Sequence, residues 1–250
     1  MQGCETKKVI NMKNISDPSI PEYVLNDLRR MMNRIAANEH WYEQLWLDVP
    51  IWQLPDDLLR LQQIVAEVKP KWIIETGTKF GGSAIFFSSL LKLLGQTEGG
   101  VITIDLTQYR ESAGTFNNHP HADLVKKAIV GDAASKEVVD QVIAAINGNE
   151  GSTLVFLDDN HNGEHVYKEM CLYAPLVTPG SYLIVADTVF EDLAGTPVGA
   201  ATEKYPDVMN SNPRVAVNRF LAERNDFSRD ERFLGKGMGN FNDGFLRRIR

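Results

Sequence analysis

The chain has 250 residues, of which 43% are hydrophobic and 24% charged, so it is long enough for one large domain or a domain with an extension. Its formal net charge is −7 and no cluster of Lys or Arg stands out, which argues against a nucleic-acid partner. Its two cysteines, Cys4 and Cys171, are too few for a disulfide framework, and we expect Cys171 to be a buried thiol. With neither a signal peptide nor an apolar run long enough to span a membrane, we expect a cytoplasmic protein without membrane insertion.

The first 55 residues predict a helical extension that acts as a lid. Residues 21–39 repeat apolar side chains at helical spacing after a proline. Residues 41–55 are interrupted by prolines and carry three tryptophans, Trp41, Trp46 and Trp52. These could form a core cluster beneath the sheet or wall a substrate site, and packing is the favoured interpretation.

From residue 56 onward the pattern predicts a single large domain, 56–250. A helix over 56–68 comes first, and strand-length apolar runs then alternate with helical patterns. The predicted strands are 71–76, 100–106, 127–132, 153–159 and 181–188. The predicted helices between them are 82–94, 135–147 and 162–174. Because the strands are almost continuously apolar, both faces of a parallel sheet should be covered by helices.

The last quarter of the chain changes character. Residues 191–213 are polar and irregular, which is typical of a lid or substrate loop. A helix is predicted over 214–224, and a hairpin within 231–250 should add an antiparallel edge to the sheet. The expected fold is therefore α/β: a doubly wound, mostly parallel, Rossmann-like sheet of seven strands with an antiparallel C-terminal hairpin.

The stretch IIETGTKFGGS, residues 73–83, ends the first strand of this domain with a glycine-rich turn. Gly77, Gly81 and Gly82 allow tight turning and remove the Cβ atoms that would keep a ligand away from the backbone. The helix that starts near Ser83 then points its free N–H groups at the same place. In a doubly wound sheet, ligands bind beyond the carboxyl ends of the strands, so this turn predicts a binding site.

The turn departs from the dinucleotide fingerprint Gly-x-Gly-x-x-Gly. Lys79 stands where the second glycine should be, and Glu75 would repel a pyrophosphate. An acid before the glycines suits a ligand with a positive end, such as S-adenosylmethionine, and class I methyltransferases use acid-x-Gly-x-x-x-Gly at this point. The predicted cofactor-binding residues of this segment are Glu75, Gly77, Thr78, Lys79, Gly81, Gly82 and Ser83.

Acidic residues also end the later predicted strands. Asp105 is placed to accept hydrogen bonds from ribose hydroxyls, Asp132 to lie near the adenine, and the pair Asp158-Asp159 to lie beside the methyl donor. One acid at a strand end is often only solvated, whereas four successive strands that end in acids favour a binding site.

Three stretches resemble the cephalosporin-hydroxylase-type family, whose fold is that of a class I S-adenosylmethionine-dependent methyltransferase. They are PIWQLPDDLLRLQQIVAEVKPKWIIETGTKFGGSAIFF, DDNHNGEHVYKEMCLYAPLVTPGSYLIVADT and NPRVAVNRFLAERNDF. The resemblance runs from about Trp41 to the C-terminus, with gaps. The site alone is similar to macrolide sugar O-methyltransferases and catechol-type O-methyltransferases.

The resemblance implies roles for individual residues. The acid after the fourth strand and an acid pair after the fifth hold Mg²⁺ in the similar enzymes, which implies Asp158 and Asp187 as metal ligands here. Ala186 stands where the first acid of that pair is expected, so one ligand is missing, although two carboxylates and waters can suffice for Mg²⁺. His161, three residues after Asp158, is implied as the general base, and both are the predicted catalytic residues.

The predicted function is an O-methyltransferase that uses S-adenosylmethionine, with Mg²⁺ as a candidate second cofactor. The acceptor would be a hydroxyl of a sugar or another small hydroxylated metabolite, because an alcohol needs a base or a metal to lose its proton. We also expect a homo-oligomer.

Several alternatives remain open at this stage. An NAD-dependent oxidoreductase would use the same kind of sheet, although Glu75 and Lys79 argue against it. A non-catalytic binding subunit is favoured by Ala186. HNGEH, residues 161–165, matches an inverted zinc-protease motif, but Gly163 within it does not suit the helix that this motif requires. His161 could instead only cap the next helix, and His165 is expected to lie on the face of that helix.

Overall fold

A computed structural model describes residues 21–37, 43–200, 202–234 and 239–250, and its centre is one seven-stranded sheet. The strand order is β5-β4-β3-β6-β7-β9-β8. The strands are β3 (Trp72–Thr76), β4 (Gly100–Asp105), β5 (Val125–Val130), β6 (Thr153–Leu157), β7 (Tyr182–Val185), β8 (Phe227–Arg229) and β9 (Phe245–Arg248). Pairing is parallel from β5 to β7, whereas β9 is antiparallel to both β7 and β8. The predicted fold class is confirmed.

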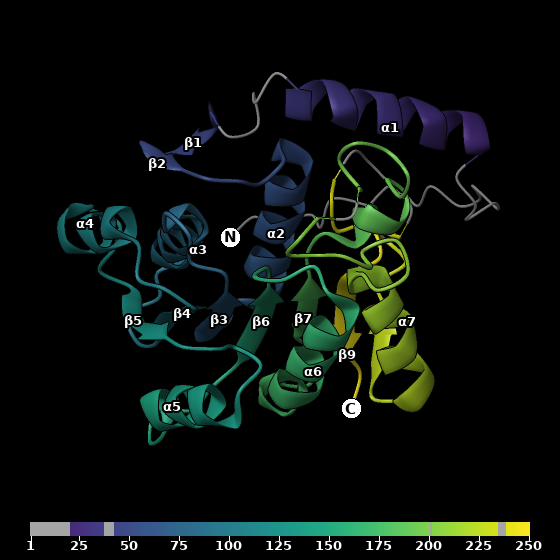
Figure 1. The fold of residues 1–250 in the computed structure, drawn as a ribbon. Helices are drawn as coiled ribbons and strands as arrows, with labels where there is room; N and C mark the ends of the chain where they lie inside the picture. The colour runs from purple at the N-terminus through teal and green to yellow at the C-terminus, as the bar shows by residue number, and fades with distance from the viewer. Residues whose placement is uncertain (1–20, 38–42, 201, 235–238) are drawn as a thin grey trace, which may run out of the picture.

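Helices cover both faces of the sheet (Figure 1). On one face, α2 (Pro55–Val68) and α3 (Gly82–Leu93) pack against the strands through one hydrophobic cluster. On the other, α5 (Lys136–Ile146), α6 (Gly163–Tyr173) and α7 (Pro213–Glu223) contribute to a second cluster. Short 3₁₀ turns follow α6 at Ala174–Leu176 and β7 at Thr188–Glu191.

Local sequence signals explain where these helices begin. Ser135, Asn162 and Asn212 each accept a backbone N–H in the first turn of α5, α6 and α7, which satisfies donors that a helix start leaves free. Pro55 and Pro213 occupy the first turns of α2 and α7, where a missing N–H costs nothing.

The structure differs from the sequence prediction in four places. The helix α4 (Arg110–Asn118) was not predicted, because it buries only Ser112 and so has no apolar stripe. β8 lies before the predicted hairpin segment, at 227–229 instead of within 231–250. β5 is an edge strand in which Lys126 and Lys127 are exposed. The prediction that helices cover both faces of the sheet was therefore wrong for this strand. Cys171 is exposed and not a buried thiol.

The N-terminal segment contains α1 (Glu22–Ala37) and a small hairpin of β1 (Leu45–Trp46) and β2 (Val49–Pro50). Leu28 and Met32 of α1 pack with apolar residues of the sheet domain, and α1 runs across one end of the molecule (Figure 1). The division into an extension, 1–55, and a domain, 56–250, stays a prediction.

The three tryptophans of this segment do not form one core cluster. Trp46 packs edge-on against Phe86 at 4.9 Å between ring centroids. Trp52 is 41% exposed and lines a cavity. Trp41 lies outside the described residues. The packing interpretation therefore holds for Trp46, and the substrate-wall interpretation describes the position of Trp52.

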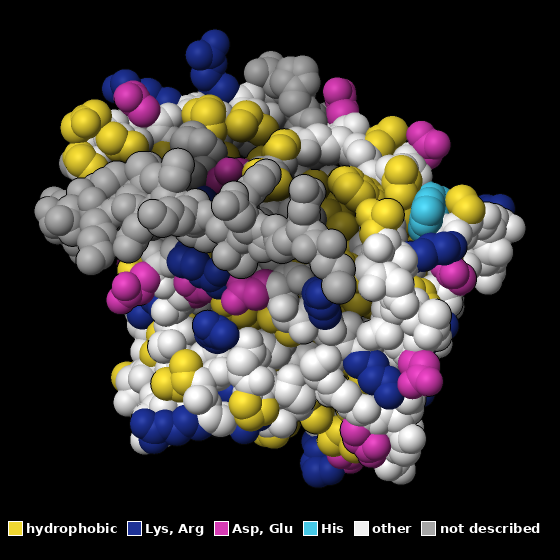
Figure 2. Space-filling model, turned by 180° about the vertical axis from the view of Figure 1, so that it is seen from behind, with side chains coloured by type: hydrophobic (Ala, Val, Ile, Leu, Met, Phe, Trp, Pro, Cys, Tyr) yellow, Lys and Arg dark blue, Asp and Glu magenta, His cyan; other side chains and the backbone are white. Residues whose placement is uncertain are grey.

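The surface gives two further facts about the described residues. On the face that Figure 2 shows, acidic and basic side chains are interspersed, without a large patch of one sign. Among the helices that the structure describes, none has the length and apolar character required to span a membrane.

Candidate active site

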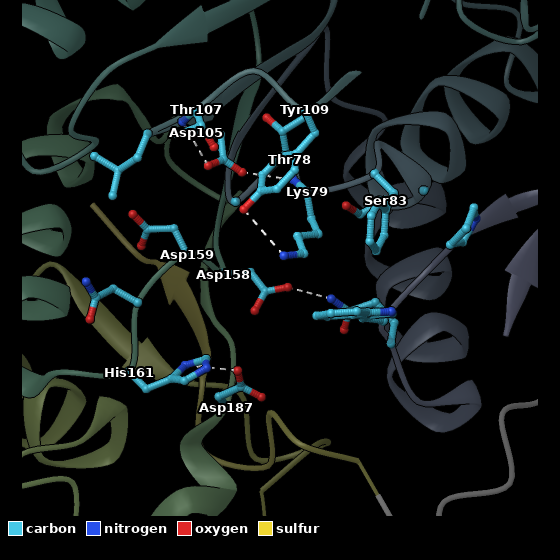
Figure 3. A pocket seen from close by; sticks show the side chains of 18 of the residues that line it. Thr78, Lys79, Ser83, Asp105, Thr107, Tyr109, Asp158, Asp159, His161 and Asp187 are labelled. Carbon is cyan, nitrogen blue, oxygen red and sulfur yellow. Dashed lines mark hydrogen bonds and ion pairs between the residues drawn. The ribbon is translucent and has the colours of Figure 1, made fainter. Parts of the chain in front are cut away.

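The carboxyl ends of the central strands open into a cavity of about 510 Å³. β3 pairs with β4 on one side and β6 on the other, so the cavity lies where the strand order reverses. Its volume falls within the range of small-molecule sites, roughly 300–1,000 Å³. Acidic side chains from three strand ends face it: Asp105 after β4, Asp158 and Asp159 after β6, and Asp187 after β7 (Figure 3).

The glycines of the loop after β3 make room for neighbouring parts of the protein. Gly77 has φ +88°, and a Cβ there would lie 2.1 Å from the backbone oxygen of Asp158. A Cβ on Gly82 would lie 2.1 Å from the backbone oxygen of Pro50. The sequence predicted that a ligand comes close to these glycines. In the structure, Gly77 is required because the backbone after β6 comes close to it, and Gly82 is required because the β1–β2 hairpin does.

Lys79 fixes the loop to β4. It adopts a left-handed backbone with φ +44°, and its N–H donates to Asp105 Oδ2 at 2.9 Å. Its Nζ donates to the hydroxyl of Tyr109 at 3.3 Å and lies 5.0 Å from the centre of the Trp52 ring (Figure 3). The acid at the end of β4 therefore anchors one side of the loop, and the ammonium is held among aromatic rings on the cavity wall.

Glu75 lies beneath the cavity and does not line it. Thr103 donates a hydrogen bond to Glu75 Oε2 at 2.7 Å, and Thr78 and Thr103 share a further one of 2.6 Å between their hydroxyls. Burial raises the pKa of Glu75 to about 7, although hydrogen bonds oppose the rise. Glu75 Oε1 has no hydrogen-bond partner among the described residues. The carboxyl thus supports the loop from below.

Asp158 and Asp187 form a partly buried acidic pair on the cavity wall. Burial, together with the charge of Asp187, raises the pKa of Asp158 well above its usual range. Burial also raises the pKa of Asp187, and His161 opposes that rise. Gln53, from the segment between β2 and α2, donates its Nε2 to Asp158 Oδ2 at 2.5 Å, the bond that leaves Asp158 in Figure 3.

His161 is held in a defined orientation at the same wall. Its Nδ1 lies 3.1 Å from Asp187 Oδ2 (Figure 3). Its ring contacts the rings of Phe190 and Tyr205 in tilted arrangements, with centroid distances of 4.7 and 4.8 Å. The residue that caps α6 is Asn162, whose Oδ1 accepts the N–H groups of Glu164 and His165. His161 is therefore free of the capping role that was its alternative interpretation.

His165 belongs to a separate cluster of titratable groups. Its Nε2 lies 3.3 Å from Asp159 Oδ2, 3.6 Å from Glu169 Oε2 and 4.0 Å from Asp132 Oδ1. Burial raises the pKa of Glu169 well above its usual range, and the nearby Asp159 adds to the rise. Burial would also raise the pKa of Asp159, but hydrogen bonds, with His165 first, hold it below its usual range. His165 lies on α6, as expected, and its ring also contacts three acidic side chains.

A sequence profile of the family described as rhamnosyl O-methyltransferase/CmcI matches residues 38–249. The chain belongs to this family. It is accordingly an S-adenosylmethionine-dependent O-methyltransferase, which decides against the oxidoreductase and hydrolase alternatives.

Known proteins similar to this methyltransferase agree with the assignment. A protein named rhamnosyl O-methyltransferase from Mycobacterium bovis (strain BCG / Pasteur 1173P2) is 28% identical over 212 residues, which cover 84% of this chain and 80% of the relative. A solved CmcI structure designated Mg-SAM is 19% identical, with TM-score 0.58, covering 84% of this chain and 78% of that one. The O-methyltransferase TomG from Streptomyces achromogenes, solved in complex with SAM, is 16% identical, with TM-score 0.52 and coverage of 90% and 89%. At these identities the two structures show a shared fold.

The structure of the methyltransferase brings most of the predicted site residues to one cavity. Those that line it are Gly77, Thr78, Lys79, Gly82, Ser83, Asp105, Asp158, His161 and Asp187. Glu75, Gly81 and Asp132 do not line it, and Asp132 instead accepts the N–H of Ala134 and faces His165. The roles of all these residues stay predictions.

Sequence reasoning missed several lining residues: Gln53, Tyr109, Phe190, Lys204 and Tyr205. Lys204 and Tyr205 lie in the segment that was predicted as a substrate loop, so that prediction contained a signal for them. Gln53 and Tyr109 precede the first turns of helices and belong to no periodic pattern. They could be found only from the three-dimensional packing.

Proposed function

We propose that the methyltransferase transfers the methyl group of S-adenosylmethionine to a hydroxyl of a sugar or similar small acceptor, and that His161 accepts the hydroxyl proton. One observation carries the proposal: His161 is oriented at the cavity wall by Asp187 at 3.1 Å and by contacts with two aromatic rings. An ionised Asp187 favours the tautomer with the proton on Nδ1. Nε2 then has a free lone pair, as a general base requires.

The cofactor half of the cavity is formed by the loop after β3 and the end of β4. S-adenosylmethionine supplies the methyl group when it is bound. Asp105 already accepts the Lys79 N–H with Oδ2 and, at 3.3 Å, the Thr107 N–H with Oδ1. Each carboxylate oxygen can accept a further hydrogen bond, so ribose hydroxyls remain possible donors to Asp105.

The residues at the methyl-donor end fit a magnesium ion. Asp158 and Asp187 offer carboxylate oxygens, which Mg²⁺ prefers. Burial raises the pKa of both acids, and the charge of Asp187 adds to the rise at Asp158, so a bound cation would stabilise their ionised forms. Bound there, Mg²⁺ would lower the pKa of an acceptor hydroxyl. His161 remains the proton acceptor of the proposal whether or not the metal is present.

The acceptor half of the cavity is lined by rings and polar groups together. Trp52, Phe190 and Tyr205 come from segments outside the central strands, and Lys204 adds a positive charge. Flat rings beside carboxylates suit a ring-shaped molecule with an apolar face and several hydroxyls. The relatives named rhamnosyl O-methyltransferase point to the same class of acceptor. We propose further that 1–55 and 191–213 act as the lid and substrate loop, and that the enzyme works in the cytoplasm as a homo-oligomer.

The test is His161→Ala, assayed with S-adenosylmethionine and a panel of rhamnosides. Losing a general base usually costs roughly 10²–10⁴-fold in turnover. Exogenous imidazole should restore part of the lost rate, and affinity for S-adenosylhomocysteine should be unchanged. His119→Ala is the matched control, because His119 does not line the cavity and its ring forms hydrogen bonds with the Leu47 carbonyl and the His121 N–H.

His165→Ala is a poor control, because it would remove the side chain that Asp159 and Glu169 both contact. If His161→Ala keeps full turnover, or if imidazole restores no activity while the fold is intact, the base is elsewhere and the proposal fails.

A further inference from the structure

We propose that Gln53 is a third metal-binding residue of this site, whose amide oxygen binds Mg²⁺ together with the carboxylates of Asp158 and Asp187. The inference rests on the magnesium site of the proposed function and names a residue that neither the glycine-rich loop nor the acidic strand ends contain. It starts from a buried polar atom that has nothing to bind.

The side chain of Gln53 is buried although it is a primary amide. It is only 4% exposed and lies between two buried apolar neighbours, Ile51 and Leu54, which anchor this segment. Its Nε2 donates to Asp158 Oδ2, but its Oε1 has no hydrogen-bond partner among the described residues. Burying an amide oxygen without a partner is unfavourable, so such an atom indicates a ligand that would satisfy it.

Rotating the terminal amide by half a turn would exchange Nε2 and Oε1. The amide oxygen would then face Asp158 Oδ2, and either a shared proton or a cation between the two oxygens would offset their repulsion. Neighbouring oxygens on an octahedral Mg²⁺ with bonds of about 2.1 Å lie about 3 Å apart. The present separation of 2.5 Å between Nε2 and Oδ2 would need to widen by only a fraction of an ångström.

The chemistry of the neighbours agrees with this assignment. Ala186, which precedes Asp187, offers no side-chain oxygen and packs in the same apolar cluster as Ile51. Asp158 and Asp187 provide two negative charges, which a dication neutralises, and a neutral amide oxygen adds a ligand without adding charge. Mg²⁺ takes oxygen ligands and keeps several waters, so three protein oxygens are enough.

A rival interpretation is that Gln53 only donates a hydrogen bond that orients Asp158. Removing Gln53 cannot separate the two, because the loss of an orienting partner also weakens metal binding, by roughly 10–100-fold. Gln53→Glu does separate them. A carboxylate is a stronger ligand for a dication than an amide oxygen, but an ionised carboxylate cannot donate to Asp158.

The experiment measures binding of Mn²⁺, as a paramagnetic probe for Mg²⁺, to the full chain by electron paramagnetic resonance, with Mg²⁺ competition. We expect Gln53→Leu to weaken Mn²⁺ binding at least ~10-fold and Gln53→Glu to tighten it. The apo form of Gln53→Glu should melt earlier than wild type and gain more in melting temperature from Mn²⁺. Gln63→Glu, the same change on the exposed face of α2, should match wild type.

Two results would overturn the inference. Weaker Mn²⁺ binding by folded Gln53→Glu would establish that Gln53 only donates a hydrogen bond. Unchanged Mn²⁺ binding by Gln53→Leu would show that Gln53 is not a ligand. Asp158→Asn separates this failure from failure of the proposed magnesium site. If Asp158→Asn binds Mn²⁺ as wild type does, or if wild type binds none, the magnesium site is wrong and the role of Gln53 falls with it. The His161 experiment is independent of either outcome.

Discussion

Replacement of Asp105 tests how the cofactor half of the cavity works. Asp105 ends β4, and its Oδ2 already accepts the Lys79 N–H at 2.9 Å. We expect it to accept two ribose hydroxyls as well. Asp105→Ala removes all of these bonds, whereas Asp105→Asn keeps one side-chain oxygen for Lys79 and loses the charge and one acceptor.

The expected effects differ enough to be told apart. A hydrogen bond to a charged group is worth roughly 1.5–3 kcal/mol, so two lost ribose bonds cost about 3–6 kcal/mol. At about 1.4 kcal/mol per factor of ten, Asp105→Ala should weaken cofactor binding by roughly 10²–10⁴-fold. Asp105→Asn, which loses about one such bond, should weaken it by roughly 10–100-fold.

Calorimetric titration with S-adenosylhomocysteine measures both constants. Asp132→Ala provides the comparison, because Asp132 does not line the cavity and should change the affinity less than either Asp105 variant. Unchanged affinity in folded Asp105→Ala would refute the assignment of β4 to the ribose. An Asp132→Ala loss as large as that of Asp105→Ala would show that the ligand extends beyond the cavity.

Three further predictions concern packing, pH and the acceptor. Gly82→Ala should lower the free energy of unfolding by about 1–3 kcal/mol, because the added Cβ would lie 2.1 Å from the Pro50 carbonyl oxygen. Gly114→Ala in α4 should stabilise the protein slightly, because open space surrounds that position. Thermal unfolding measures both effects. Burial raises the pKa of Asp57 from 3.8 to about 7, so the folded state holds a proton that the unfolded state releases between those values. Stability should therefore fall as pH rises from about 4 to about 7, and Asp57→Asn should flatten this part of the profile measured by denaturant titration. Tyr205→Ala should raise KM for the acceptor and lower turnover, since its ring both lines the cavity and contacts His161, while S-adenosylhomocysteine affinity should stay within about twofold of wild type.

The sequence predicted the sheet well because its signals are local. Buried parallel strands read as continuous apolar runs, and the glycine-rich turn after β3 marks the point where the strand order reverses. α4 escaped prediction because a helix that buries one residue leaves no stripe to detect. β8 escaped because three residues are too few for a visible alternation, and its pairing with β9 depends on contacts distant in sequence.

The candidate site was predictable where its residues lie at the ends of strands. It was not predictable where it depends on contacts between side chains from separate segments. Asp105 and Asp158 could be placed because each comes at the end of an apolar run, whereas Asp187 was implied by the family resemblance. The contact of His161 with Phe190 and Tyr205 joins three separate segments, and no spacing in the sequence encodes it. The burial of Glu75 below the cavity follows from its position within β3, where alternate side chains face opposite sides of the sheet.

The anchoring of the loop after β3 has a consequence for how this enzyme can change. The loop is fixed on one side by Asp105 and on the other by the contact of Gly77 with the backbone after β6. Its shape is therefore set before any ligand arrives, and little ordering entropy remains to be lost on binding. Of the rings proposed to face the acceptor, Phe190 and Tyr205 come from segments after β7, whereas Trp52 contacts Lys79 and Phe80 of the loop itself. If 191–213 is the substrate loop proposed above, its exchange should change acceptor preference while the affinity for the methyl donor is kept.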